Sequence, residues 1–92
     1  MVNSLPLMLK AAMSDRYIPV SCQLHSEYEL AIMHAQTLQL IWRTATGKLA
    51  TETLKPYDLI THEGSEFLLV QSANGEDKKI RLDKIIEAHP VS

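Results

Sequence analysis

The residues that could do chemistry in this 92-residue chain are four histidines, one cysteine and eleven carboxylates. Cys22 and His25 have the spacing of half a zinc site, but no second pair of ligands follows them. No nucleophile is paired with a base, and the three glycines are isolated rather than grouped in a phosphate-binding loop. We therefore expect no catalytic residue, no metal site, no cofactor and no enzymatic activity. Cys22 is expected to be a small buried side chain.

The position of the charges says more than the net charge of −2. Residues 22–36 carry −2 and residues 57–77 carry −5, whereas residues 37–56 and 78–92 carry +2 each. A chain that is slightly acidic has no bulk attraction to nucleic acid or to anionic lipid, so such binding would need a local basic patch. We expect no direct binding of nucleic acid and no membrane partner.

One helix is predicted over Glu27 to Gln36. Ser26 and Glu29 have the spacing of a capping box. In this motif the Ser26 hydroxyl accepts a hydrogen bond from the N–H of Glu29, and the Glu29 carboxylate accepts one from the N–H of Ser26. Glu27 and Glu29 are then expected to complete this cap and to complement the helix dipole. Leu30 and Met33, with Ala31 and His34 beside them, form the inward stripe.

Five short strands are predicted after the helix. The first starts at Thr37 and has Leu38, Leu40 and Trp42 on one face. The other four are predicted at 48–54, 57–62, 66–71 and 78–82, with Pro56 ending the second and turns at Gly47, at Glu63-Gly64-Ser65 and at Asn74-Gly75. The fold class is therefore mainly β, a strongly bent antiparallel five-stranded sheet or small barrel preceded by one α-helix.

The chain is expected to hold one domain, residues 17–92, preceded by a mobile or weakly docked leader at residues 1–16. Its longest apolar stretches are far shorter than the roughly 20 residues that cross a bilayer. The order of charge and apolar residues over Met1 to Met13 is wrong for a secretory signal, so a cytoplasmic location is expected.

Beyond these patterns, an ordered set of motifs resembles the Rho-binding antiterminator family, also called Rof. The resemblance runs from about Tyr17 to Ile86 and includes Tyr17-x-Pro19-x-x-Cys22, Glu29-Leu30-Ala31 followed by His34, Asp58-Leu59, Glu66-Phe67-Leu68-x-Val70, Gly75-Glu76 and Ile80-Arg81-Leu82-Asp83-Lys84-Ile85. It implies an Sm-like fold and a bacterial cytoplasmic inhibitor of the transcription termination factor Rho. Such a protein binds the N-terminal RNA-binding region of Rho and keeps RNA off it.

The resemblance also implies which residues contact Rho. By position they are Gln23, His25, Ser26, Glu27, Glu29, His62, Glu63 and Gly64. Gln23, Leu24 and Ser26 stand where relatives carry Asp. Either Glu27 and Glu63 offset that loss, or the affinity for Rho is reduced, or the partner has changed. The alternative function is an Sm-like RNA-binding module, which the basic segment from Lys78 to Lys84 favours.

Overall fold

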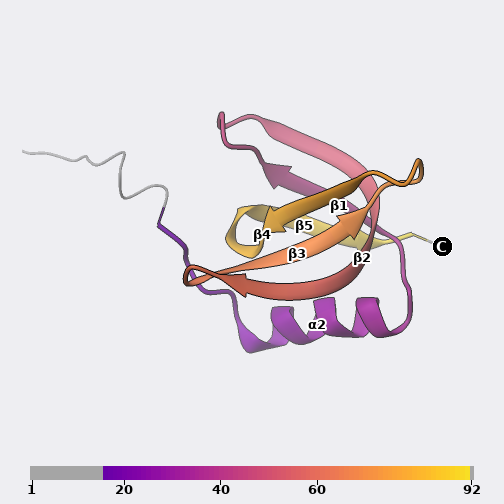
Figure 1. The fold of residues 1–92 in the computed structure, drawn as a ribbon, viewed down its shortest axis with the longest axis horizontal. Helices are drawn as coiled ribbons and strands as arrows, with labels where there is room; N and C mark the ends of the chain where they lie inside the picture. The colour runs from indigo at the N-terminus through magenta and orange to yellow at the C-terminus, as the bar shows by residue number, and fades with distance from the viewer. Residues whose placement is uncertain (1–15, 92) are drawn as a thin grey trace, which may run out of the picture.

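The structure, a computed structural model, describes residues 16–91, in which one helix is followed by five strands (Figure 1). The elements are α2 (Cys22–Met33), β1 (Leu38–Arg43), β2 (Leu49–His62), β3 (Ser65–Gln71), β4 (Asp77–Arg81), the 3-10 turn η1 (Leu82–Lys84) and β5 (Ile85–Pro90). All strand pairs are antiparallel, in the order β4-β3-β2-β1-β5. The predicted mainly β fold, with a helix before a five-stranded sheet, is confirmed. Apart from Arg16, the expected leader at 1–16 lies outside the described residues.

The strand β2 has fourteen residues and two different partners. Leu49 to Leu54 pair with β1, and Lys55 to His62 pair with β3. The prediction that Pro56 ends a strand is wrong, because the chain bends there and the register shifts between Pro56 and Asp58. A residue without an N–H is tolerated where the ladder is interrupted by such an irregularity. Two predicted strands are thus one arc, which curves around the molecule (Figure 1).

The strand β5 was not predicted. The segment predicted as the fifth strand is the fourth in the structure, and β5 follows it after η1. Its partner is β1, in a register that sets Leu38 opposite Pro90 and Leu40 opposite Ala88. Because the two strands are far apart in the chain, no local pattern indicates this pairing.

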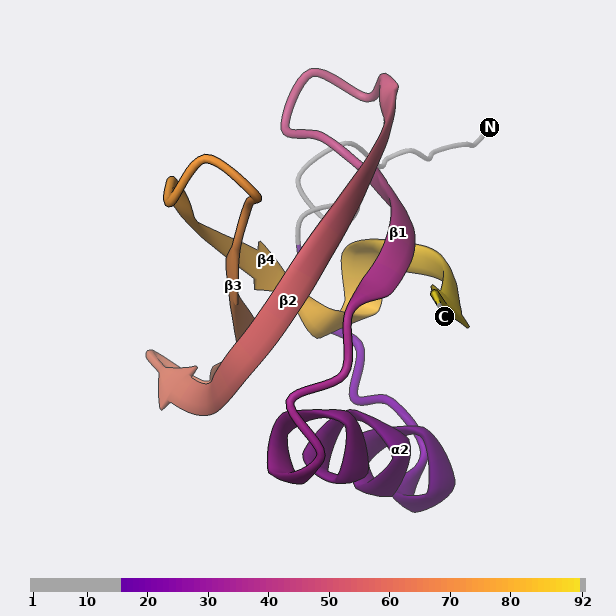
Figure 2. The ribbon, with the colours of Figure 1, turned by 90° about the vertical axis from the view of Figure 1, so that its right-hand side faces the viewer.

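The core lies inside the curled sheet and under the helix. The most buried apolar side chains are Leu40, Leu54, Leu68 and Val70 of the sheet and Leu82 of η1. The helix lies along one side of the sheet (Figures 1 and 2), with Tyr28 and Ala31 buried.

The predicted inward stripe of the helix is wrong for Leu30, Met33 and His34. Leu30 is 51 % exposed and Met33 is 76 % exposed, and His34 is also exposed. The face of the helix that packs on the core instead carries Leu24, Tyr28, Ala31 and Ile32, at three- and four-residue spacing, and the three predicted residues lie outside it. None of the described helices is long and apolar enough to cross a membrane.

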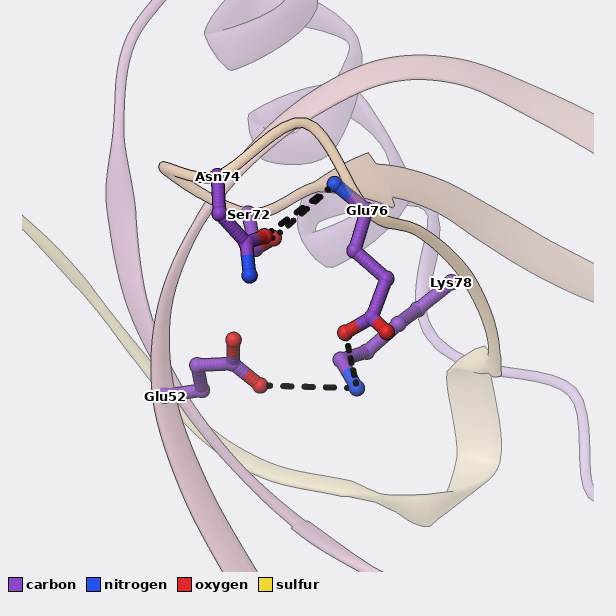
Figure 3. Close-up of polar contacts among 5 residues, drawn as sticks. All are labelled: Glu52, Ser72, Asn74, Glu76 and Lys78. Atoms are coloured by element: carbon purple, nitrogen blue, oxygen red, sulfur yellow. Dashed lines mark hydrogen bonds and ion pairs between the residues drawn. The ribbon is translucent and has the colours of Figure 1, made fainter.

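An ion pair between non-neighbouring strands follows from the curl of the sheet. Lys78 on β4 lies 3.7 Å from Glu52 on β2 and 3.7 Å from Glu76 (Figure 3). The strand β3 separates β2 from β4 in the sheet, so the two side chains meet only because the sheet bends. At the same turn, the N–H of Glu76 donates to Ser72 Oγ at 3.1 Å and to Asn74 Oδ1 at 3.2 Å. These bonds hold the turn in which Gly75 has a φ of 86°.

The chain before the helix is fastened to the sheet by Asp83. Its carboxylate accepts from Arg81 Nε at 2.7 Å, from Arg81 Nη2 at 2.9 Å and from the N–H of Ile18 at 2.9 Å. Its side chain is only 6 % exposed. Burial alone would raise the pKa of Asp83, but the hydrogen bonds from Arg81 and Ile18 outweigh that effect, and the pKa lies below its ordinary value of 3.8.

Replacing Asp83 by Asn should therefore destabilise the protein in a pH-dependent way. A carboxyl group whose pKa is lowered on folding stabilises the folded state above its unfolded pKa, and this contribution is lost as pH falls through the folded value. We expect Asp83→Asn to lower the free energy of unfolding by about 2 kcal/mol at pH 7. Urea denaturation should show this difference shrinking below about pH 4. A difference that stays constant down to about pH 2 would contradict the assignment, and Asp77→Asn is the exposed control.

The helix ends in a Schellman motif that uses an unfavourable residue. The N–H of Gln36 donates to the carbonyl of Ala31 at 2.9 Å, and that of Ala35 donates to Ile32 at 3.1 Å. Ala35 sits at the position with positive φ, 52°, where glycine is usual.

Ala35→Gly should stabilise the protein by about 0.5–1 kcal/mol, because glycine has no Cβ to strain this conformation. Ala35→Val should destabilise it by at least that amount. Both changes are measured by urea denaturation, and a Gly variant less stable than the parent would refute the prediction.

Candidate functional site

The helix begins five residues earlier than predicted, and this changes the role of its acids. Its N-cap is Ser21, whose Oγ accepts from the N–H of Leu24 at 3.1 Å. The predicted cap at Ser26 is wrong, because Ser26 lies within the helix and is exposed. The first turn holds no acid, so Glu27 and Glu29 neither complete the cap nor complement the dipole there. The carboxylates of Glu27 and Glu29 can therefore contact groups outside the helix start.

His25 lies between two glutamates from different parts of the chain. Its Nδ1 is 3.9 Å from Glu29 Oε2, one turn further along the helix, and its Nε2 is 3.6 Å from Glu66 Oε2 on β3. Glu66 Oε1 also accepts from the hydroxyl of Tyr17 at 3.1 Å. Desolvation, with the hydrogen bond to Glu66 added, raises the pKa of Tyr17 to about 12. The phenol therefore stays protonated and keeps donating to the carboxylate.

A hollow of about 200 Å³ lies between the helix and the end of β2. His25 and Glu29 line it from the helix side, and Thr61 and Glu66 line it from the sheet. Thr61 and Glu66 are paired in the register, one step before the turn that joins β2 to β3. We call His25, Glu29, Thr61 and Glu66 the acidic hollow.

The turn after the acidic hollow exposes one more carboxylate. His62 and Ser65 are paired, so Glu63 and Gly64 form a two-residue turn, and their φ values are 50° and 81°. Positive φ at both positions is the signature of a type I′ turn. Glu63 is 84 % exposed and lies 3.9 Å from His62 Nε2. The predicted turn is therefore confirmed, and it presents Glu63 to the solvent.

The structure brings together only part of the predicted contact set. His25 lies between Glu29 of the helix and Glu66 of β3, and the His62–Ser65 pair separates Glu66 from the turn. Gln23 and Ser26 are exposed on the helix. Glu27 lies apart, in a groove of about 250 Å³ between the helix and β5. Of the predicted set, His25 and Glu29 thus line one groove and Glu27 lines another.

Glu66 and Tyr17 were not among the predicted contact residues. Their contacts join the segment before the helix, the helix and β3. The local sequence pattern does not indicate that these parts of the chain meet. The one available signal is the cluster of acids in residues 57–77, where Glu66 follows Glu63 by three positions.

Neither a buried cysteine nor a metal cluster is found in this region. Cys22 is exposed at the helix start, so its expected burial is wrong. Within residues 16–91, no three His, Cys, Asp or Glu side chains are placed to hold a metal ion. What the region offers chemically is a set of carboxylate acceptors beside one histidine.

Two curated proteins are similar over most of this chain. Protein rof of Escherichia coli (strain K12) is 35 % identical over 79 residues, which make up 85 % of this chain and 88 % of that protein. Protein rof of Shigella flexneri gives the same identity and coverage. No protein-family model matches the chain.

A solved structure at low sequence identity has a similar fold. Proteasome accessory factor B/C of Arthrobacter aurescens superposes with a TM-score of 0.68 at 14 % identity. The match covers 83 % of this chain and 12 % of that one. At this identity the likeness concerns the fold alone.

Glu63→Asn should remove the turn's charge and stabilise the fold. Asn tolerates positive φ better than Glu, so we expect the free energy of unfolding to rise by about 0.5–1 kcal/mol. The exposed contact with His62 contributes little by comparison. Thermal or urea denaturation measures the change. A loss of stability would show that Glu63 makes a contact worth more than its backbone strain.

Proposed function

This chain belongs to the Rof family, and we propose that it inhibits Rho-dependent transcription termination by binding the N-terminal RNA-binding region of Rho. The proposal is supported by the identity to the two proteins named rof over 85 % of the chain. It is also supported by the ordered motifs from Tyr17 to Ile86. In this proposal the protein is a cytoplasmic regulator rather than an enzyme, and its partner is another protein.

The acidic hollow and the turn beside it are the surface proposed to contact Rho. A surface that holds RNA presents cations to phosphates, and carboxylates of another protein can pair with the same cations. The observation that carries the proposal is the meeting of helix and sheet at His25, where Glu29 and Glu66 are both within 4 Å of the ring. Glu63 extends the same negative surface beyond the sheet.

Glu66 places a carboxylate beside the start of the helix, where the helix itself has few acidic residues. Gln23, Leu24 and Ser26 carry no charge at positions where the family resemblance implies Asp. We propose that Glu29, Glu63 and Glu66 supply the negative charge instead. Gln23, Ser26, His62 and Gly64 would then contribute shape and hydrogen bonds at the rim, and Glu27 would contact Rho only if the interface extends toward β5.

The architecture is proposed to be Sm-like, with residues 17–92 as its domain. A helix that precedes a strongly bent five-stranded antiparallel sheet supports this, as does the 3-10 turn between the last two strands. The attachment of Tyr17 and Ile18 to Glu66 and Asp83 supports a domain that starts near residue 17. Fold alone does not select the partner.

Removing carboxylates from this surface should weaken binding to Rho. We expect Glu29→Gln combined with Glu63→Asn to raise the Kd for purified Rho about tenfold, which corresponds to roughly 1.4 kcal/mol. The effect should be larger at low salt, because exposed charges are screened as ionic strength rises. Biolayer interferometry without RNA measures the Kd directly.

Glu76→Gln is the matched control for this experiment. It removes one carboxylate, half the charge lost in the double variant, at the turn between β3 and β4, which is at the other end of β3 from Glu63. We expect less than a twofold change. The proposal fails if the parent protein does not bind Rho, or if the control weakens binding as much as the double variant does. Circular dichroism verifies that each variant is folded.

A further inference from the structure

A second surface of the molecule is basic and aromatic. Side chains from the end of β1, from β3, from β4 and from η1 surround a groove of about 330 Å³. We call it the basic groove, and its lining includes Trp42, Arg43, Phe67, Lys79, Arg81 and Lys84. We propose that the basic groove binds single-stranded nucleic acid. This proposal is separate from the contact with Rho and uses other residues.

Two aromatic side chains give the basic groove surfaces for stacking. Trp42 on β1 and Phe67 on β3 both line it and are both half-buried. The Nζ of Lys79 lies 4.8 Å from the centre of the Phe67 ring, so a face of that ring is open to a cation. Bases stack on such rings whatever their sequence, while the cation can turn to a neighbouring phosphate.

The charges of β4 divide between the two faces of the strand. Lys78 is held by Glu52 and Glu76, as Figure 3 shows, and it is absent from the lining of the groove. Lys79 and Arg81 do line the groove, and Arg81 is paired with Asp83. The basic segment noted in the sequence therefore contributes alternate residues, not the whole run, to this surface.

Two cations of the groove have no carboxylate partner in the described part of the chain. Arg43 donates from Nη1 to the carbonyl of Gly47 at 2.8 Å, and Lys79 contacts the Phe67 ring. Neither forms an ion pair with any residue of 16–91. A chain with a net charge of −2 needs a local patch to attract phosphates, and these two residues supply one.

The rings favour nucleic acid over an acidic peptide as the ligand. Carboxylates would need only the cations, and stacking surfaces would add nothing to their recognition. A single strand alternates phosphates with bases, and a groove that combines cations with aromatic side chains matches both.

Trp42 provides a direct test, because it is the one tryptophan of the chain. A single-stranded RNA of about 12 nucleotides, a length within usual site sizes, is titrated into the protein without Rho. We expect quenching of the Trp42 fluorescence, because a base stacks on the ring. Anisotropy of the same RNA carrying fluorescein should give a matching Kd, and log Kd should rise with log salt concentration.

Substitutions inside and outside the basic groove show where the RNA binds. We expect Arg43→Gln combined with Lys79→Gln to raise the Kd at least about tenfold and to reduce the salt slope by about two, one for each lost phosphate contact. Lys55→Gln is the control for the loss of one cation outside the groove, because Lys55 is exposed and lines a different pocket on β2. It should change the Kd less than about twofold.

Three results would overturn the proposal. The first is RNA that neither quenches Trp42 nor changes anisotropy, and the second is equal binding by the parent and the double variant. The third is polyglutamate or uridine monophosphate binding as tightly as the RNA, which would assign the groove to an acidic peptide or to a free nucleotide. Since Rho is absent from these titrations, their failure leaves the proposed contact with Rho to be judged by its own test.

Discussion

The continuity of β2 past Pro56 is the constraint on which the rest of the structure depends. The strand is hydrogen-bonded to β1 over its first part and to β3 over its second, so one bend sets the two halves of the sheet at an angle. The ion pair between Glu52 and Lys78 spans the resulting curl. The helix packs against β2, and this packing places His25 within 3.6 Å of Glu66. A straight β2 would separate the elements that line both surfaces.

Local patterns predicted the kinds of element better than their limits. The glycines at positive φ correctly indicated the turns, since few other residues adopt that conformation. The pattern predicted a helix start at Ser26, but the N-cap is Ser21, three residues after Ile18, whose N–H donates to Asp83 on the sheet. The strand β5 could not be predicted from local sequence either, because it is defined by its pairing with β1, which is far away in the chain.

The two surfaces differ in how far the sequence could predict them. The exposed Glu63 belongs to a turn that its neighbour Gly64 marks, so its position was predictable. Glu66 acquires its role from a helix residue 41 positions earlier in the chain, and only the folded structure brings them together. The basic groove likewise depends on strands that are not consecutive. The net charge of −2 therefore does not reveal that an acidic hollow and a basic groove lie on the same chain.

Whether this protein displaces RNA from Rho can be measured by competition. Labelled cytidine-rich RNA is bound to purified Rho, and the protein carrying Arg43→Gln and Lys79→Gln is added, so that released RNA is not bound again at the basic groove. We expect the anisotropy to fall to the value of free RNA as the protein reaches micromolar concentration. RNA that stays bound to Rho in the presence of a large excess of the protein would contradict this expectation.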